Sequence, residues 1–87
     1  MSYLQNGDYV YVIDADVRPC DSVIFYASIV DARVGVSLCV VQVESEHPRY
    51  AMGSYKMVSI ADVFGEQNMC RLVLGERTWQ EQGCPMT

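Results

Sequence analysis

One stretch dominates the hydrophobic pattern of this chain: residues 22–34, SVIFYASIVDARV. It is rich in β-branched and aromatic residues and contains no glycine or proline, a composition typical of a buried β-strand. The stretch is also longer than an average strand, so it can bend and pair with neighbours on both edges. We therefore predict that it forms the central strand of a small antiparallel barrel.

Alternation along this strand divides its side chains between two faces. Phe25, Ala27 and Ile29 share one face, whereas Tyr26 begins the row on the other. Asp31 interrupts the first row, and burying its carboxylate without a partner would cost several kcal/mol. The strand is therefore expected to bend, or to emerge into solvent, at Asp31.

Other apolar runs predict four more strands around the central one. They are residues 9–13 (YVYVI), 36–43 (VSLCVVQV), 50–60 with a kink at Gly53, and 70–74 (CRLVL). The polar stretches 14–21 and 44–49 are predicted to be loops. Alternatively, all of residues 44–54 form one long hairpin loop.

The C-terminal third allows more than one interpretation. Ser59 and Asp62 have the spacing of a helix start, which predicts a helical turn over residues 60–64, ended by Gly65. A helix over residues 66–82 would spread its apolar side chains over about 220° of arc and place Gly75 inside the helix, at a cost of about 1 kcal/mol. We therefore favour a fifth strand at 70–74, followed by at most a short helix from the capping-box spacing of residues 78–81.

Four segments carry a likeness to a known family. They are residues 7–12 (GDYVYV), 27–30 (ASIV), 41–43 (VQV) and 58–64 (VSIADVF). In this order, and with a short helical turn before the last strand, the chain resembles the SH3-like small barrels, including the tudor-type and KOW-type domains. The resemblance implies a five-stranded barrel over about residues 7–74, with a tail over 75–87.

The chain departs from the peptide-binding SH3 domains of that family. Residues 13–16 (IDAD) stand where such a domain would have an ALYDY-like run, and Trp79 is the only tryptophan. Polyproline recognition is therefore not expected.

Length and charge narrow the classes of function. A chain of 87 residues corresponds to a single domain, here residues 1–87. Its net charge is −5, and no basic stripe is present, so direct contact with nucleic acid is not expected. Residues 1–8 lack the features of a signal peptide, and no apolar run approaches the ~20 residues that cross a bilayer. We predict a cytoplasmic protein without a membrane segment.

The cysteines do not have the spacing of a metal site. A structural zinc site uses close pairs, whereas the intervals between these cysteines are long, so reduced thiols are expected. The four are Cys20, Cys39, Cys70 and Cys84.

Other candidate ligands and catalytic groups are also weak. Asp14, Asp16 and Asp21 lack the glycine and the terminal glutamate of an EF-hand loop, and turn-forming aspartates are the favoured interpretation. His47 is the only histidine and the only partner for a cysteine nucleophile, but it lies in a polar loop beside Pro48, where we expect it to be solvated. No metal, cofactor or enzymatic activity is predicted.

The excess of tyrosine favours a protein-binding module, because the amphipathic tyrosine ring is enriched at interfaces. We predict a binding face framed by the loops 14–21 and 44–54, with the residues Tyr11, Tyr26, Arg49, Tyr50 and Tyr55. Tyrosines that merely pack on the sheet are the simpler interpretation, and an aromatic cage for a cation would need them to converge.

Two alternatives remain open at this point. Apolar residues on both faces of the strands predict a self-assembling structural homodimer. Small size and acidity are compatible with an accessory protein of a phage or mobile element that inhibits a nucleic-acid-binding host protein by charge mimicry.

Overall fold

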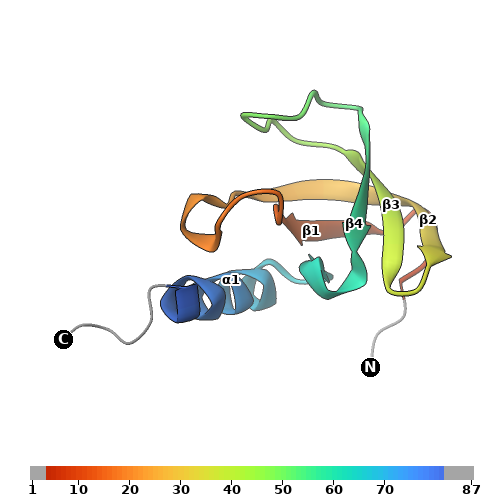
Figure 1. Cartoon of the computed structure of the whole chain (residues 1–87). Helices are drawn as coiled ribbons and strands as arrows, with labels where there is room; N and C mark the ends of the chain where they lie inside the picture. The colour runs from red at the N-terminus through yellow and green to blue at the C-terminus, as the bar shows by residue number, and fades with distance from the viewer. Residues whose placement is uncertain (1–3, 82–87) are drawn as a thin grey trace.

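The computed structural model describes residues 4–81 and is mainly β, with one C-terminal helix (Figure 1). Five antiparallel strands form a sheet with the spatial order β4-β3-β2-β1-β5. The strands are β1 (Tyr9–Ile13), β2 (Ile24–Gly35), β3 (Leu38–Val43), β4 (Tyr55–Ser59) and β5 (Val63–Phe64). Two short 3₁₀ turns, η1 (Pro19–Asp21) and η2 (Ile60–Asp62), and the helix α1 (Gln67–Glu81) complete the chain.

The predicted central strand is confirmed. β2 lies in the middle of the sheet and pairs with β1 on one side and β3 on the other. Directly opposed residues of antiparallel strands point to the same face, and the core lies on the face of Phe25, Ala27 and Ile29, as the alternation predicts. Val10 and Val12 of β1 and Val41 and Val43 of β3 complete the centre of that core.

The predicted bend at Asp31 is also present. The β2–β3 register shifts between Ile29 and Asp31, and Asp31 is exposed. A β-bulge bends the strand at this point, so Asp31 remains part of the sheet while its carboxylate is exposed to solvent.

The segment after β3 differs from its prediction. A strand over residues 50–60 is wrong, because β4 begins only at Tyr55. Residues 44–54 instead form one long connection, which agrees with the alternative of a long loop. Gly53 has φ +87°, a turn conformation that favours glycine, and its N–H donates to the carbonyl of Val43.

The helical turn after β4 is shorter than predicted. The Ser59 hydroxyl accepts a hydrogen bond from the N–H of Ala61, so Ser59 does cap a turn, but the turn ends at Asp62. Val63 and Phe64 then pair with Val12 and Tyr11 as β5. The fifth strand is therefore correct in number and wrong in position.

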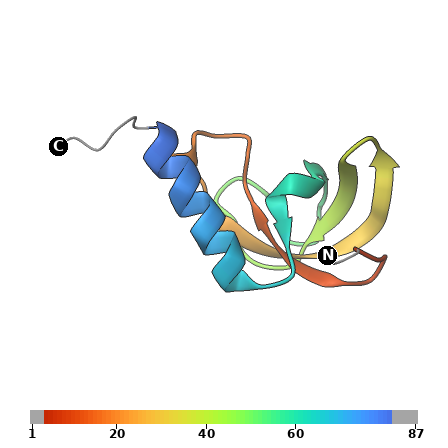
Figure 2. The same cartoon turned by 90° about the horizontal axis from the view of Figure 1, so that it is seen from below.

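The predicted strand at 70–74 is wrong, because these residues belong to α1. The tail predicted from residue 75 is likewise helical as far as Glu81, and residues 82–87 lie outside the described part. The helix packs against η1, β1 and β5 along one side of the sheet (Figure 2). Only Cys70 is fully buried, whereas Leu72 and Trp79 are exposed. A wide amphipathic pattern is absent because the helix buries only a narrow strip.

The helix is fixed to the sheet by ionic contacts as well. Arg77 lies 2.6 Å from the carboxylate of Asp62, which is nearly buried, and donates to the carbonyl of Ala61. About one turn further along α1, Glu81 accepts from the N–H of Cys20 and lies 3.2 Å from Arg18. Among residues 4–81, no helix is long and apolar enough to span a membrane.

Candidate functional site

The five predicted binding residues are not brought together. Arg49 and Tyr50 lie in the long β3–β4 connection, where Tyr50 packs against the core through Phe25. Tyr11, Tyr26 and Tyr55 lie on strands, on the face of the sheet opposite the core. The structure therefore contains two separate regions, described in turn.

The first region is centred on Asp14, whose side chain is fully buried. One carboxylate oxygen, Oδ1, accepts from the Tyr50 hydroxyl at 2.9 Å and from the N–H of Asp16 at 3.1 Å. The other oxygen, Oδ2, accepts from the guanidinium of Arg49. The bond to the N–H of Asp16 is that of an aspartate in a turn, in line with the sequence prediction.

A second carboxylate extends this network. Asp16 accepts from the Tyr50 hydroxyl and lies 2.6 Å from Nζ of Lys56. The same ammonium group lies 4.7 Å from the centroid of the Tyr50 ring, within the range of a cation–π contact. We refer to Asp14, Asp16, His47, Arg49, Tyr50 and Lys56 together as the Asp14 cluster.

The expectation that His47 is solvated is wrong. Its side chain is fully buried and stacks on Tyr50, with 4.2 Å between ring centroids. Nδ1 accepts from the N–H of Arg49, which leaves the proton of a neutral imidazole on Nε2. Nε2 lies 3.2 Å from Oδ2 of Asp14. The imidazole thus lies between the loop and Phe25, and the rings of His47 and Phe25 make a T-shaped contact.

The contacts within the cluster shift the pKa values of its side chains. Burial opposes the ionisation of Asp14, but hydrogen bonds from Arg49, the N–H of Asp16 and Tyr50 outweigh it and hold the pKa of Asp14 below its usual value. Hydrogen bonds from Lys56 and Tyr50 likewise lower the pKa of Asp16. Burial, together with the two carboxylates, raises the pKa of Tyr50. All three groups are thereby held in the protonation state that pairs them at neutral pH.

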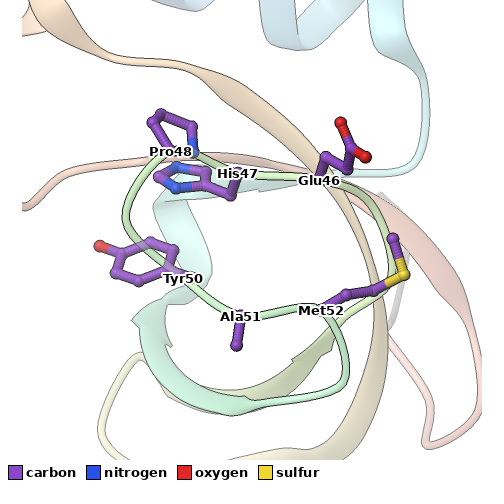
Figure 3. A pocket seen from close by; sticks show the side chains of 6 residues that line it. All are labelled: Glu46, His47, Pro48, Tyr50, Ala51 and Met52. Atoms are coloured by element: carbon purple, nitrogen blue, oxygen red, sulfur yellow. The ribbon is translucent and has the colours of Figure 1, made fainter.

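The long connection folds back on itself beside this cluster (Figure 3). It borders a hollow of about 570 Å³ that is open to solvent, with His47 and Tyr50 side by side at one end and Met52 at the other. Glu46, Pro48 and Ala51 complete the lining. No cysteine of the described part of the chain lines it, so the hollow does not join His47 to a thiol.

A smaller hollow of about 160 Å³ contains the carboxylates of Asp14, Asp16 and Asp62. Each of these carboxylates is paired with a cation, from Arg49, Lys56 or Arg77. Within residues 4–81, no group of three or more His, Cys, Asp or Glu side chains has the geometry to hold a metal ion. These ion pairs can hold the loops in place, but each carboxylate of the hollow is already neutralised by its cation.

The described cysteines line neither of these two hollows. Cys39 and Cys70 are fully buried and unpaired, and Cys20 is exposed and unpaired. Burial raises the pKa of Cys39, and it raises that of Cys70 to about 11. Such thiols are protonated at neutral pH and behave as small apolar side chains.

The second region is the outer face of the sheet. Tyr9 and Tyr26 stack with 5.5 Å between ring centroids and 7° between planes, and Tyr11 packs on Tyr26 at 5.2 Å. Tyr9 is 60% exposed. Next to them, the hydroxyl of Ser28, which pairs with Tyr9 across the β1–β2 ladder, donates to Glu44 at 2.7 Å. We call these five residues the outer tyrosine face.

The strand register extends the outer tyrosine face across the neighbouring strands on both sides. Tyr9, Ser28, Gln42 and Tyr55 are opposed in one row across four strands, and Tyr55 is 68% exposed. Phe64 of β5 stands opposite Tyr11 in the neighbouring row. The tyrosines lie along the sheet and do not converge on one point as a cage would require.

Sequence reasoning missed several of these residues. Tyr9 and Glu44 were not predicted as binding residues, although the alternation of YVYVI places Tyr9 on the same face as Tyr11. The contact of His47 with Asp14 joins positions far apart in the chain. Its only signal was the prediction that the loops 14–21 and 44–54 frame one face, and the Asp14 cluster does join these two loops.

Comparisons with known proteins leave this geometry as the basis for assigning a function. No protein-family model, no curated protein and no solved structure matches the chain.

Proposed function

We propose that this protein is a non-enzymatic protein-binding module and that its outer tyrosine face is the surface that contacts the partner. The single observation that carries the proposal is the Tyr9–Tyr26 stack, which lies on the sheet with Tyr9 largely exposed. Tyrosine offers a large, rigid contact area with a polar tip, and it is enriched at interfaces for that reason.

The Asp14 cluster supports the proposal indirectly, because its polar groups already have partners within the chain. The polar groups of Arg49 and Tyr50 already bond to Asp14 and Asp16, so a ligand would have to displace existing hydrogen bonds to pair with them. The hydroxyls of Tyr9, Tyr11 and Tyr26 make no hydrogen bond with residues 4–81 in the structure. Of the residues predicted from sequence, Tyr11, Tyr26 and Tyr55 therefore fit a binding role better than Arg49 and Tyr50.

We also propose that the sheet is a divergent SH3-like barrel. The support is the order of its elements: strand, loop, long bent strand, turn, strand, loop, strand, 3₁₀ turn, strand. Two further features support the proposal: the register shifts in β2, since bulges bend strands, and the pairing of β5 with β1.

The proposal is tested by selecting ligands from a displayed library of random peptides on the immobilised full chain. The selected peptides are then measured by fluorescence anisotropy against Tyr9→Ser and Tyr11→Ser. The control is Val36→Ser, which changes an exposed apolar side chain between β2 and β3, 93% exposed. We expect both tyrosine variants to weaken binding at least about tenfold, as interface tyrosines do, and the control to bind as the wild type. Equal binding by wild type and both tyrosine variants would refute the proposal.

A second function, self-association, is favoured by one specific observation. Leu72 and Trp79 lie seven residues apart, so they share one face of α1, and they are 68% and 55% exposed. A homodimer could bury them. Light scattering at high micromolar concentration tests this: a monomer would reject the dimer and leave the binding module untouched, whereas a dimer dispersed by Leu72→Ser with Trp79→Ser would support it.

A further inference from the structure

The distribution of unpaired charge indicates what kind of partner the outer tyrosine face would accept. Four of the six basic residues lie in ion pairs with acids of the same chain: Arg18, Arg49, Lys56 and Arg77. Within residues 4–81, this leaves two bases without a carboxylate partner, Arg33 and Arg71. It leaves six acids without a cationic partner: Asp8, Asp31, Glu44, Glu46, Glu66 and Glu76. The surplus negative charge therefore lies outside the Asp14 cluster.

Glu44 places part of this surplus directly at the tyrosines. Its N–H donates to the carbonyl of Tyr26, and its Oε2 accepts from Ser28, which stands opposite Tyr9. Its second oxygen, Oε1, accepts no hydrogen bond from residues 4–81. The carboxylate is thus held beside the stacked rings with free capacity to accept.

No lysine or arginine side chain of residues 4–81 forms an ion pair with Glu44. Arg33 lies seven residues beyond Tyr26 along β2, which is about 23 Å at ~3.3 Å per residue. Arg71 lies on α1, which packs against β1, β5 and η1. Arg49 bonds to Asp14 beside the core face. A lysine or arginine side chain that pairs with Glu44 would therefore come from another molecule.

We propose that the outer tyrosine face binds a lysine- or arginine-rich segment of a protein partner; this inference rests on the proposed function. One cationic side chain lies against the exposed ring of Tyr9 and the edge of Tyr26, and its N–H groups donate to Oε1 of Glu44. A guanidinium or ammonium group satisfies both surfaces, because it is attracted to the face of an aromatic ring and bonds to carboxylates. A nucleic acid or an anionic membrane surface does not fit, because the surplus carboxylates would repel phosphate groups.

The test is a titration of the ¹⁵N-labelled full chain, followed by NMR, with a short synthetic peptide of alternating lysine and glycine. The reference is the same peptide with glutamine in place of lysine. We expect the lysine peptide to shift the amide signals of residues 9, 11, 26, 28 and 44, and the glutamine peptide to shift them weakly or not at all. Raising the salt from about 0.05 M to about 0.5 M should weaken binding, because exposed charges are screened.

Two matched variants isolate the role of the carboxylate. Glu44→Gln keeps the shape and the hydrogen-bond capacity toward Ser28 but removes the charge, and we expect it to weaken lysine-peptide binding about threefold to fivefold, the size of an exposed charge contact. Glu76→Gln, on α1, removes an equal charge elsewhere and should leave binding unchanged. Far-UV circular dichroism confirms that each variant is folded.

The outcomes separate this inference from the function on which it rests. Equal binding of the lysine and glutamine peptides, or equal weakening by Glu44→Gln and Glu76→Gln, would overturn the cationic partner. The binding module would still stand in that case if neutral peptides from the displayed library lost affinity for Tyr9→Ser. If neither kind of peptide responds to Tyr9→Ser, both proposals fail.

Discussion

The Asp14 cluster and the outer tyrosine face are both rich in tyrosine, yet their polar groups are used differently. In the cluster, the Tyr50 hydroxyl bridges two carboxylates, and each carboxylate also meets a cation. On the outer face, the rings of Tyr9 and Tyr26 stack while Tyr9 stays exposed. The comparison shows that two tyrosine-rich regions can differ in whether their polar groups are already bonded within the chain.

The largest effect is expected from removing the centre of the cluster. Asp14→Ala removes the acceptor that Arg49 and Tyr50 share and the carboxylate that faces Nε2 of His47, and breaking an ion pair whose carboxylate is buried costs about 3–5 kcal/mol. Urea denaturation measures the free energy of unfolding. Asp31→Ala is the matched control, because that carboxylate is exposed. A loss below about 1 kcal/mol for Asp14→Ala would show that the cluster does not hold the loops.

Acid should destabilise the protein through the same cluster. The pKa values of Asp14 and Asp16 lie below their usual values in the folded protein, so the stabilisation is fully present above the unfolded-state pKa of ~3.9. It is lost as the pH falls through the lower folded-state values, because protons then bind preferentially to the unfolded chain. The free energy of unfolding, followed from about pH 7 to about pH 2, should fall below pH ~4. It should fall less steeply in Asp14→Asn, and equal slopes would contradict the assignment.

A substitution outside both regions gives a reference for the size of these changes in the free energy of unfolding. Gly75 lies inside α1, and a Cβ built there meets no atom within 4 Å. Gly75→Ala should raise the free energy of unfolding by about 0.5–1 kcal/mol, because glycine is a poor helix former. Thermal unfolding detects the gain. An unchanged or lowered stability would contradict the helix at this position.

The smallest effect on stability is expected on the outer face. Tyr9→Ser removes a largely exposed ring, and we expect the free energy of unfolding to change by no more than about 0.5–1 kcal/mol, the worth of one aromatic pair. Binding should nevertheless be reduced. A loss of stability comparable to that of Asp14→Ala would mean that Tyr9 is a structural residue.

The strands around the core were predictable because their signal is local. Alternation in residues 22–34 groups Phe25 with Ala27, and the charge of Asp31 predicts the bend in that strand. In residues 9–13 both faces are apolar or aromatic, so it is the pairing with β2 that decides that Val10 and Val12 are buried. Helix α1 was not predictable by the same reasoning. Its buried strip is narrow, Arg77 turns inward to pair with Asp62, and the exposed Leu72 obscures the periodicity.

The candidate site was predictable only in part, because its contacts are not local. The tyrosines were identified from composition, but composition does not separate Tyr50, which is tied to Asp14 across 36 residues, from Tyr26, which is stacked on the sheet. The burial of His47 depends on the same long-range contact. Pairing between loops arises from the fold as a whole and leaves little trace in either loop alone.

The most direct test deletes one hydroxyl from each region by the same substitution. Tyr50→Phe and Tyr9→Phe each keep the ring, so any difference in the free energy of unfolding by urea reports on the hydroxyl alone. We predict that Tyr50→Phe lowers it by about 1–3 kcal/mol, because the buried carboxylate of Asp14 and the exposed carboxylate of Asp16 lose the single O–H donor that they share, and that Tyr9→Phe leaves it unchanged. Equal effects of the two substitutions would contradict the division of the molecule into a bonded structural cluster and a free binding face.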